Sequence, residues 1–250
     1  MAANAEPAHA HVYGSAVRAN THTNMKRIAV LISNKSGGSN LQAMLDGQAD
    51  RFDGQVAVVA SDKEDAYGLV RAREADVPTV VLDHADYAAH GRPRSHYEED
   101  LAHKLQRFAP DLIVLAGWTY DLSDAFHRYF PWRVLSVHPG LLPDPGYHKY
   151  KLPDGNFADP CLGLTGENAI QAVLAGGQKW AGSSVFAHTP DGGAGPVFQR
   201  AVVEVHGGDT VEKLYARIKP AEHKALTRAL AEICRVAVAR APQYGDVRRG

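Results

Sequence analysis

RVLSVHPGLLP, residues 133–143, is the stretch that sets the expected architecture of this chain of 250 residues. Valine and leucine predominate in residues 134–137, which is typical of a strand buried on both faces, and a Pro-Gly pair ends that strand directly after His138. Open α/β sheets bind ligands just beyond the carboxyl ends of their strands. The stretch therefore predicts a strand that delivers His138 to a site, with a purely structural histidine as the alternative.

Before this stretch, apolar segments typical of strands alternate with segments of helical periodicity. Strands are expected at residues 27–33, 55–61, 79–82 and 111–117, and helices from residue 41, over 66–75 and over 95–108. Strands that alternate with helices of about ten residues form right-handed crossover units and a mostly parallel sheet. We therefore expect an α/β, Rossmann-like fold.

The regular alternation of strands and helices ends after His138. A helix is expected around residues 166–177, followed by strands at 183–189 and 197–205, whose alternation predicts antiparallel pairing. A long amphipathic helix is then expected from about residue 210 to 241, bent near Pro220. The parallel sheet should thus carry a carboxyl-terminal antiparallel extension and a long final helix.

The chain divides into one folded domain, residues 26–242, and two tails. Residues 1–25 show no sustained apolar period and no apolar core of a secretory signal, so we expect a flexible tail, and a second tail is expected at 243–250. Residues 143–164 are rich in Pro, Gly and Asp, which predicts a long surface loop inserted in the domain. Such a loop either contacts a substrate or is simply solvated.

Composition excludes several classes of protein. A net charge of -1 gives no electrostatic footprint for nucleic acid or for an anionic membrane. Cys161 and Cys234 show no metal-type spacing, so we expect no metal, no disulfide framework, and a reducing cytoplasmic setting. We interpret both thiols as packed rather than nucleophilic, and no segment approaches the roughly 20 apolar residues of a membrane span.

A glycine-rich turn, SNKSGGSN (residues 33–40), joins the first strand to the first helix. Gly37 and Gly38 let backbone amides approach an anion, Ser39 offers a hydroxyl, and a helix amino terminus carries positive partial charge. These features favour a phosphate or carboxylate site. The alternative is a turn in which Ser39 merely caps the helix.

Blocks in a fixed order resemble the folate-dependent formyltransferase family across residues 27–235. The matching stretches are IAVLIS, GGSNLQAML, ASDKEDAYGLVRARE, APDLIVLAGW, VLSVHPGLLP, AGSSVFAHTPDGGAGPV and ARIKPAEHKAL. The resemblance implies the Rossmann-like formyltransferase fold. It also implies that Gly38, Ser39 and Asn40 hold the substrate phosphate, and that Glu222 meets the amine and ribose side of the substrate.

The resemblance further implies a folate pocket built from Arg94 and residues 118–122. That segment is Trp118, Thr119, Tyr120, Asp121 and Leu122. Tyr120 replaces the basic residue of the family, and Asp121 replaces an apolar one. For Trp118 and Tyr120, packing in the core is the alternative role.

His138 matches the catalytic histidine of the family. The resemblance places an oxyanion donor at Ser136, where the family has asparagine, so a shorter hydroxyl would act there, directly or through a water. Gly193 stands where the family has the aspartate that raises the histidine pKa. Asp191 lies two residues away and is expected to take that role if its turn shifts. Otherwise Asp191 simply opens the turn.

The implied reaction is formyl transfer from 10-formyltetrahydrofolate to the amine of glycinamide ribonucleotide in purine synthesis. The expected partner is a small phosphorylated amine, and neither nucleic acid nor a membrane is expected to bind. We expect the protein to be a monomer or a homodimer. Two alternatives stay open at this point. One is a related transferase or hydrolase with a different acceptor, and the other is a catalytically silent relative that binds a ligand.

Overall fold

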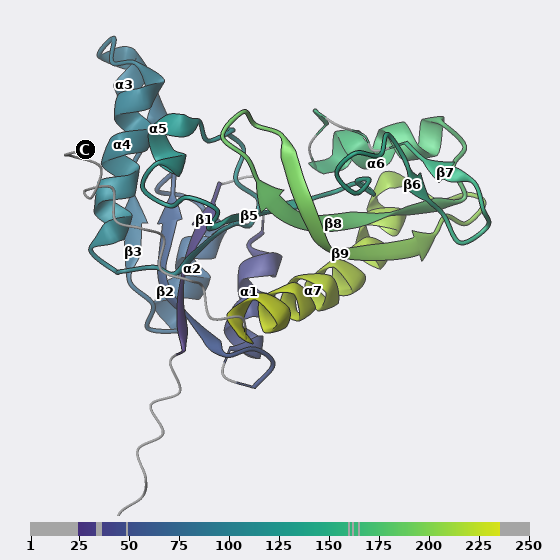
Figure 1. Cartoon of the computed structure of the whole chain (residues 1–250), viewed down its shortest axis with the longest axis horizontal. Helices are drawn as coiled ribbons and strands as arrows, with labels where there is room; N and C mark the ends of the chain where they lie inside the picture. Colours follow the sequence, from purple (N-terminus) through teal and green to yellow (C-terminus); the bar gives the residue numbers. More distant parts are fainter. Residues whose placement is uncertain are drawn as a thin grey trace, which may run out of the picture.

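The computed structural model describes residues 25–33, 37–48, 50–159, 161, 163–164 and 166–235. Its centre is a seven-stranded sheet in the order β3-β2-β1-β4-β5-β8-β9 (Figure 1). The pairs from β3 to β5 are parallel, whereas β5 with β8 and β8 with β9 are antiparallel. The strands are β1 (Lys26–Ile32), β2 (Gly54–Ser61), β3 (Thr79–Val81), β4 (Leu112–Leu115), β5 (Val134–His138), β8 (Trp180–His188) and β9 (Ala194–Glu204).

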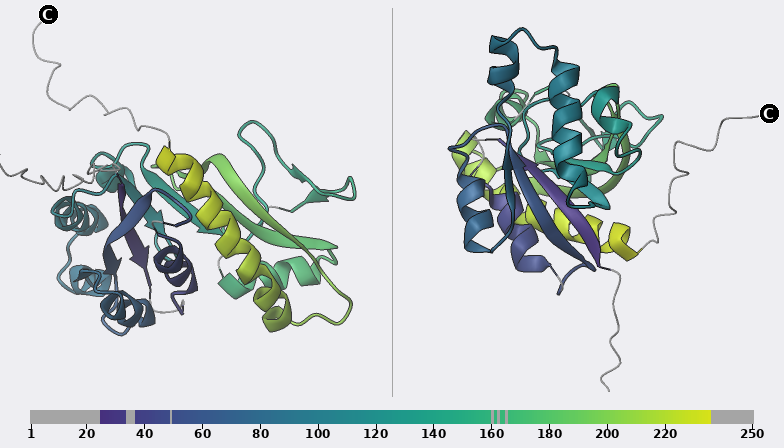
Figure 2. Two further views of the ribbon diagram at one scale, coloured as in Figure 1. Left: turned by 90° about the horizontal axis from the view of Figure 1, so that it is seen from below. Right: turned by 90° about the vertical axis from the view of Figure 1, so that its left-hand side faces the viewer.

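Helices cover both faces of this sheet (Figure 2). One core cluster joins the strands to α1, α2 and α7, and the other joins them to α4 and α5. The helices are α1 (Ser39–Gly47), α2 (Tyr67–Glu74), α3 (His84–Ala89), α4 (Arg94–Gln106), α5 (Asp124–His127), α6 (Gly166–Ala175) and α7 (Val211–Arg235). The three-layer arrangement follows from strands that are buried on both sides.

This architecture confirms the predicted fold class. Each expected strand and helix is present, and the antiparallel extension and long final helix follow His138 as predicted. The sequence did not reveal α3 and α5, because helices of 6 and 4 residues are too short to show a helical period. Pro220 lies inside α7, which continues to Arg235. The last expected residues of that helix lie outside the described part.

The insertion is more ordered than the sequence indicated. Within residues 143–164 the strands β6 (Tyr150–Lys151) and β7 (Phe157–Ala158) pair antiparallel, so the predicted loop contains a short hairpin in its middle part. Leu141, Leu152 and Ala158 form a small core of their own beneath it. Alternation over two-residue strands is too short to read from sequence.

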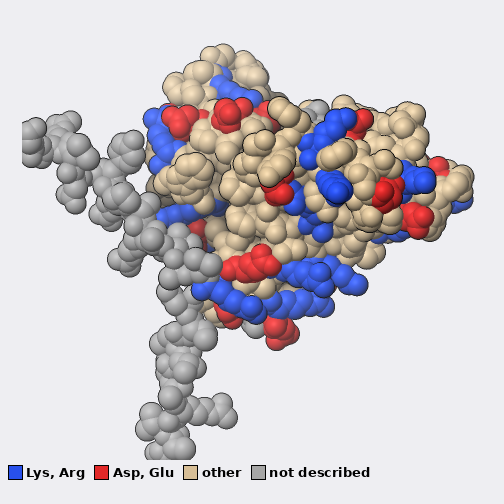
Figure 3. All heavy atoms as spheres, turned by 45° about the vertical axis from the view of Figure 1, so that its right-hand side comes forward, with Lys and Arg blue, Asp and Glu red and all other residues tan. Residues whose placement is uncertain are grey.

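Both predicted tails lie largely or wholly outside the described residues. No helix in the described part combines the length and apolar character needed to cross a membrane. On the face shown in Figure 3, Lys and Arg side chains lie close to Asp and Glu side chains, so charges of both signs share that surface.

Candidate active site

His138 is the last residue of β5, the strand at which the sheet changes from parallel to antiparallel pairing. β5 pairs with β4 on one side, and on the other His138 lies opposite Ser184 of β8. Cavities open near this strand end. Their walls come from the loops that follow the parallel strands, from α7 and from the β8–β9 turn.

The first cavity, about 160 Å³ in volume, joins the start of α1 to the middle of α7 beside the residues that flank His138. We call it the phosphate-side cavity. It is lined by Ser39, Asn40, Ala116, Gly117, Trp118, Val137, Pro139, Gly166, Tyr215, Lys219 and Glu222.

The turn before α1 has a structural reason for its glycine. Gly38 has a φ of 68°, and a Cβ on it would lie 2.9 Å from the Cα of Gly68 in α2. Ser39 is the first residue of α1, and no side chain among the described residues caps this helix. The alternative role of Ser39 as N-cap is therefore wrong. Its backbone lies in the first turn, whose amides have no acceptor within the helix.

Polar side chains converge in the phosphate-side cavity. The side chain of Asn40 is buried, and its Oδ1 has no hydrogen-bond partner among the described residues. Lys219 Nζ lies 2.7 Å from Glu222 Oε1 and 4.6 Å from the ring centre of Tyr215. Burial works to lower the pKa of Lys219, but the Glu222 carboxylate outweighs it and the pKa is raised. Lys219 is therefore a cation in the same cavity as an amide oxygen that has no hydrogen-bond partner among the described residues.

A second cavity of about 250 Å³ lies on the other side of the 118–122 segment. We call it the donor-side cavity. Arg94 Nε lies 2.9 Å from Glu98 Oε1, and Glu98 Oε2 accepts hydrogen bonds from the backbone and hydroxyl of Ser123. The buried Glu98 thus fixes the guanidinium at the cavity wall. The lining is Arg94, Ser95, Glu98, Asp121, Leu122, Ser123, Pro190, Asp191 and Gly192.

The 118–122 segment, predicted as one folate wall, divides between the two cavities. Trp118 lines the phosphate-side cavity, whereas Asp121 and Leu122 line the donor-side cavity. Thr119 shares a hydroxyl contact of 3.2 Å with Ser33. The ring centre of Tyr120 lies 4.7 Å from that of His84 in a tilted arrangement, so its described contacts are those of aromatic packing.

Asp191 lies in the β8–β9 turn, where its carboxylate accepts hydrogen bonds from Thr189 Oγ1 at 2.5 Å and from the amide of Gly193 at 3.3 Å. The Thr189 bond, followed by the Gly193 bond, lowers the pKa of Asp191. The turn also brings Asp191 into the donor-side cavity with Arg94. Its pairing with His138 stays a prediction.

Ser136 lies two residues before His138 on the same face of β5, opposite Leu115 of β4 and Phe186 of β8. It is half-buried, as is His138. Its role as an oxyanion donor also stays a prediction.

Comparison with known proteins agrees with this geometry. The sequence model of the family described as "Formyl transferase" matches residues 26–230. The chain belongs to the formyl transferase family.

Relatives of this formyltransferase include one protein of similar length and one much longer protein. Phosphoribosylglycinamide formyltransferase of Escherichia coli is 36% identical over 198 residues, which cover 78% of this chain and 81% of that protein. The human trifunctional purine biosynthetic protein adenosine-3 is 33% identical over 82% of this chain, but the match covers only 18% of that larger protein.

Solved structures show the same fold. Glycinamide ribonucleotide transformylase 1 of Symbiobacterium toebii superposes with a TM-score of 0.70 at 38% identity, over 84% of this chain and 88% of that chain. Phosphoribosylglycinamide formyltransferase of Brucella melitensis gives a TM-score of 0.69 at 33% identity, over 86% and 99% of the two chains.

Sequence reasoning missed several groups of this formyltransferase site. Lys219 stands three residues before Glu222, which places both on one helix face, so the spacing could have revealed it. Glu98 stands four residues after Arg94, so the spacing could likewise have indicated this ion pair. The buried contact of His127 with His188 joins residues 61 apart, and no local pattern reports it.

Within the described ranges, no group of three His, Cys, Asp or Glu side chains is arranged to hold a metal ion.

Proposed function

We propose that this formyltransferase transfers the formyl group of 10-formyltetrahydrofolate to the amine of glycinamide ribonucleotide. One observation carries the proposal: the phosphate-side cavity joins the first turn of α1 to Lys219 and Glu222 beside the strand end that bears His138. A phosphorylated amine needs an anion site and a carboxylate at opposite ends of one cavity. The relatives named for this reaction support the same substrate.

On the acceptor side, the phosphate would bind the backbone amides of Gly38, Ser39 and Asn40 at the amino terminus of α1. The unpaired Oδ1 of Asn40 is an acceptor for a donor group on the substrate, since a buried amide oxygen without a partner is costly. Glu222 is 3% exposed and would hold the ammonium or the ribose hydroxyls. Lys219 orients that carboxylate through their ion pair.

On the donor side, Arg94, Asp121 and Leu122 would contact the folate. Leu122 is buried and offers an apolar wall, whereas Asp121 offers a carboxylate that can accept from ring or amino N–H groups. Arg94, fixed by Glu98, is placed to attract an anionic part of the folate. Trp118 and Thr119 would line the passage between the two cavities, and Tyr120 would support them from behind.

His138, whose two chain neighbours line the phosphate-side cavity, would act on the reacting carbon. Attack of the amine on the formyl carbon forms a tetrahedral intermediate with negative charge on its oxygen. A protonated His138 stabilises that oxyanion and shuttles a proton from the attacking nitrogen to the departing N10, directly or through water. The Ser136 hydroxyl would donate a second hydrogen bond, and Asp191 would hold the proton on His138 if its turn moves.

Purified protein with both substrates tests the proposal. We expect formylated glycinamide ribonucleotide to appear in step with tetrahydrofolate, and His138→Ala to lose at least about 100-fold in kcat. No product with wild type, or a His138→Ala variant equal to wild type, would overturn it. Steady formate release without any amine would instead indicate a hydrolase. Binding of folate without turnover would indicate a silent relative.

A further inference from the structure

The chain that follows His138 does not leave the sheet freely but crosses β8 and β9 on the face that bears the histidine. In the antiparallel register, His138 lies opposite Ser184, and Ser184 lies opposite Arg200 of β9. Side chains opposite one another in antiparallel strands point to the same face. His138, Ser184 and Arg200 therefore form one row across the sheet.

Two members of this row hold the crossing segment. The buried Ser184 hydroxyl donates to the Gly140 carbonyl at 2.8 Å and accepts from the Leu142 amide at 2.9 Å. Arg200 Nε donates to the Leu142 carbonyl at 2.7 Å, and its terminal nitrogen donates to Asp144 Oδ1 at 2.8 Å. Both backbone groups of Leu142 are thus held by the sheet beneath it.

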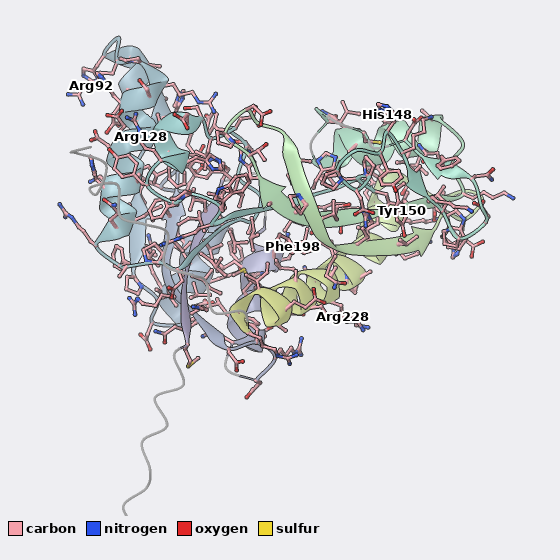
Figure 4. The ribbon with its side chains drawn as sticks, viewed as in Figure 1. Arg92, Arg128, His148, Tyr150, Phe198 and Arg228 are labelled. Atoms are coloured by element: carbon pink, nitrogen blue, oxygen red, sulfur yellow. The ribbon has the colours of Figure 1, made fainter. Side chains whose placement is uncertain are left out.

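Further contacts extend this hold into the insertion. The Arg200 guanidinium lies 4.6 Å from the ring centre of Tyr150, at the start of the β6–β7 hairpin. Figure 4 shows Tyr150 beside β8 and β9. Gly182, two residues before Ser184, makes room for Leu141, because a Cβ there would lie 2.7 Å from Leu141 Cδ2. These contacts favour the observed path of the segment after His138 across β8 and β9 over other paths.

The held segment forms one wall of a third cavity, about 430 Å³ in volume, beside β5. Residues 142–147 line one side, Gly192 to Ala194 of the β8–β9 turn line the other, and Phe186, which pairs with Ser136, forms the floor. Gly192 also lines the donor-side cavity. The wall formed by residues 142–147 therefore faces the same β8–β9 turn that borders the donor-side cavity.

We propose that Arg200 is a positioning residue for formyl transfer. Its guanidinium holds the wall formed by residues 142–147 closed over the end of β5, which orients His138 and keeps bulk water from the formyl carbon. This rests on the proposed function. When the wall is loose, water adds to the formyl carbon, the carbon–nitrogen bond to N10 breaks and N10 takes a proton, so that formate and tetrahydrofolate leave without transfer.

Arg200→Gln tests the proposal, with Arg228→Gln on the exposed face of α7 as the matched control. We expect Arg200→Gln to lower kcat at least about tenfold and to raise the ratio of formate to formylated product, while Arg228→Gln leaves both unchanged. Arg200→Lys should rescue little, because an ammonium cannot hold a carbonyl and a carboxylate in a fixed fork. Equal kcat and equal formate ratio in all variants would overturn the proposal.

Amide hydrogen exchange without substrates separates this inference from the proposed function. We expect faster exchange at residues 142–151 in Arg200→Gln and unchanged exchange in β1 and β4. Asp144→Asn, which leaves Arg200 in place and removes the negative charge of one exposed partner, should give the same change to a smaller extent and covers the case of a poorly folded Arg200 variant. Unchanged exchange in both variants would show that Arg200 does not hold the wall. Absence of formyl transfer by wild type would instead refute the proposed function.

Discussion

His127 of α5 and His188 of β8 form a buried pair, with Nε2 of His127 3.0 Å from Nδ1 of His188 and the rings stacked at 5.2 Å. One ring must donate and the other accept, so at least the accepting ring is neutral. Burial lowers the pKa of both rings, and His188 further lowers that of His127, to about 4. The charges that oppose these shifts are Asp124 and Asp191 for His127, and Asp121, Asp191 and Glu98 for His188.

This pair predicts that acid destabilises the protein well above the range where carboxylates titrate. A histidine pKa lowered from 6.5 to about 4 means that the unfolded chain binds the proton first. The contribution of His127 is complete above pH 6.5 and is lost progressively as the pH falls toward 4. We expect a loss of about 2–3 kcal/mol from the free energy of unfolding over that range, measured by urea denaturation.

The double variant His127→Gln/His188→Gln provides the control, because glutamine keeps a hydrogen-bonding side chain and removes both titrating rings. Its free energy of unfolding should change less between pH 6.5 and 4 than that of wild type. Equal slopes in the two proteins would contradict a role for the pair.

The turn before α1 predicts a contrast between two neighbouring glycines. Gly38→Ala places a Cβ 2.9 Å from the Cα of Gly68 at a φ of 68°, so we expect the free energy of unfolding to fall by about 1–3 kcal/mol. Gly37→Ala meets nothing within 4 Å and should change it by less than about 0.5 kcal/mol. Thermal unfolding of both variants measures the difference. Equal loss in both would show that the approach of α1 to α2 is not the cause.

Some of these features could be predicted from the sequence, and others could not. Buried strands and amphipathic helices leave periodic patterns, so the parallel strands up to β5 and the place of His138 at a strand end were predictable, although the order of the strands in the sheet was not. The contact of His127 with His188 and the hold of Arg200 on Leu142 depend on strand register and loop path. Those depend on three-dimensional packing, for which the chain carries no local signal.

The Lys219–Glu222 pair predicts a substrate effect on one side only. Lys219→Met removes the cation beside Glu222 in the phosphate-side cavity, so the KM of the phosphorylated amine should rise about tenfold or more, with the KM of the folate changed less than about twofold. Lys224→Met, on the exposed face of the same helix, is the matched control. A rise confined to the KM of the folate would contradict the assignment of Lys219 to the site of the phosphorylated amine.

Two adjacent glutamates predict opposite behaviour. Glu98 is buried and bonds both Arg94 and Ser123, so Glu98→Gln should lower the free energy of unfolding by about 1–3 kcal/mol and raise the KM of the folate. Glu99 pairs with the half-exposed Arg128, and Glu99→Gln should cost less than about 1 kcal/mol and leave that KM unchanged. Denaturation and initial rates on both variants check this, and matching effects would refute the assignment of Arg94 to the donor side.

Ser136 gives the sharpest kinetic prediction, because it stands on the His138 face of β5 where the family has an amide donor. Ser136→Ala removes the hydroxyl and should lower kcat by about tenfold or more, with little change in either KM, since an oxyanion donor acts mainly on the transition state. Ser136→Asn places a longer donor at the same position, and we expect kcat at or above the wild-type value. Single-turnover rates isolate the chemical step. If Ser136→Ala transfers formyl as fast as wild type while His138→Ala does not, the oxyanion is stabilised by His138 without Ser136.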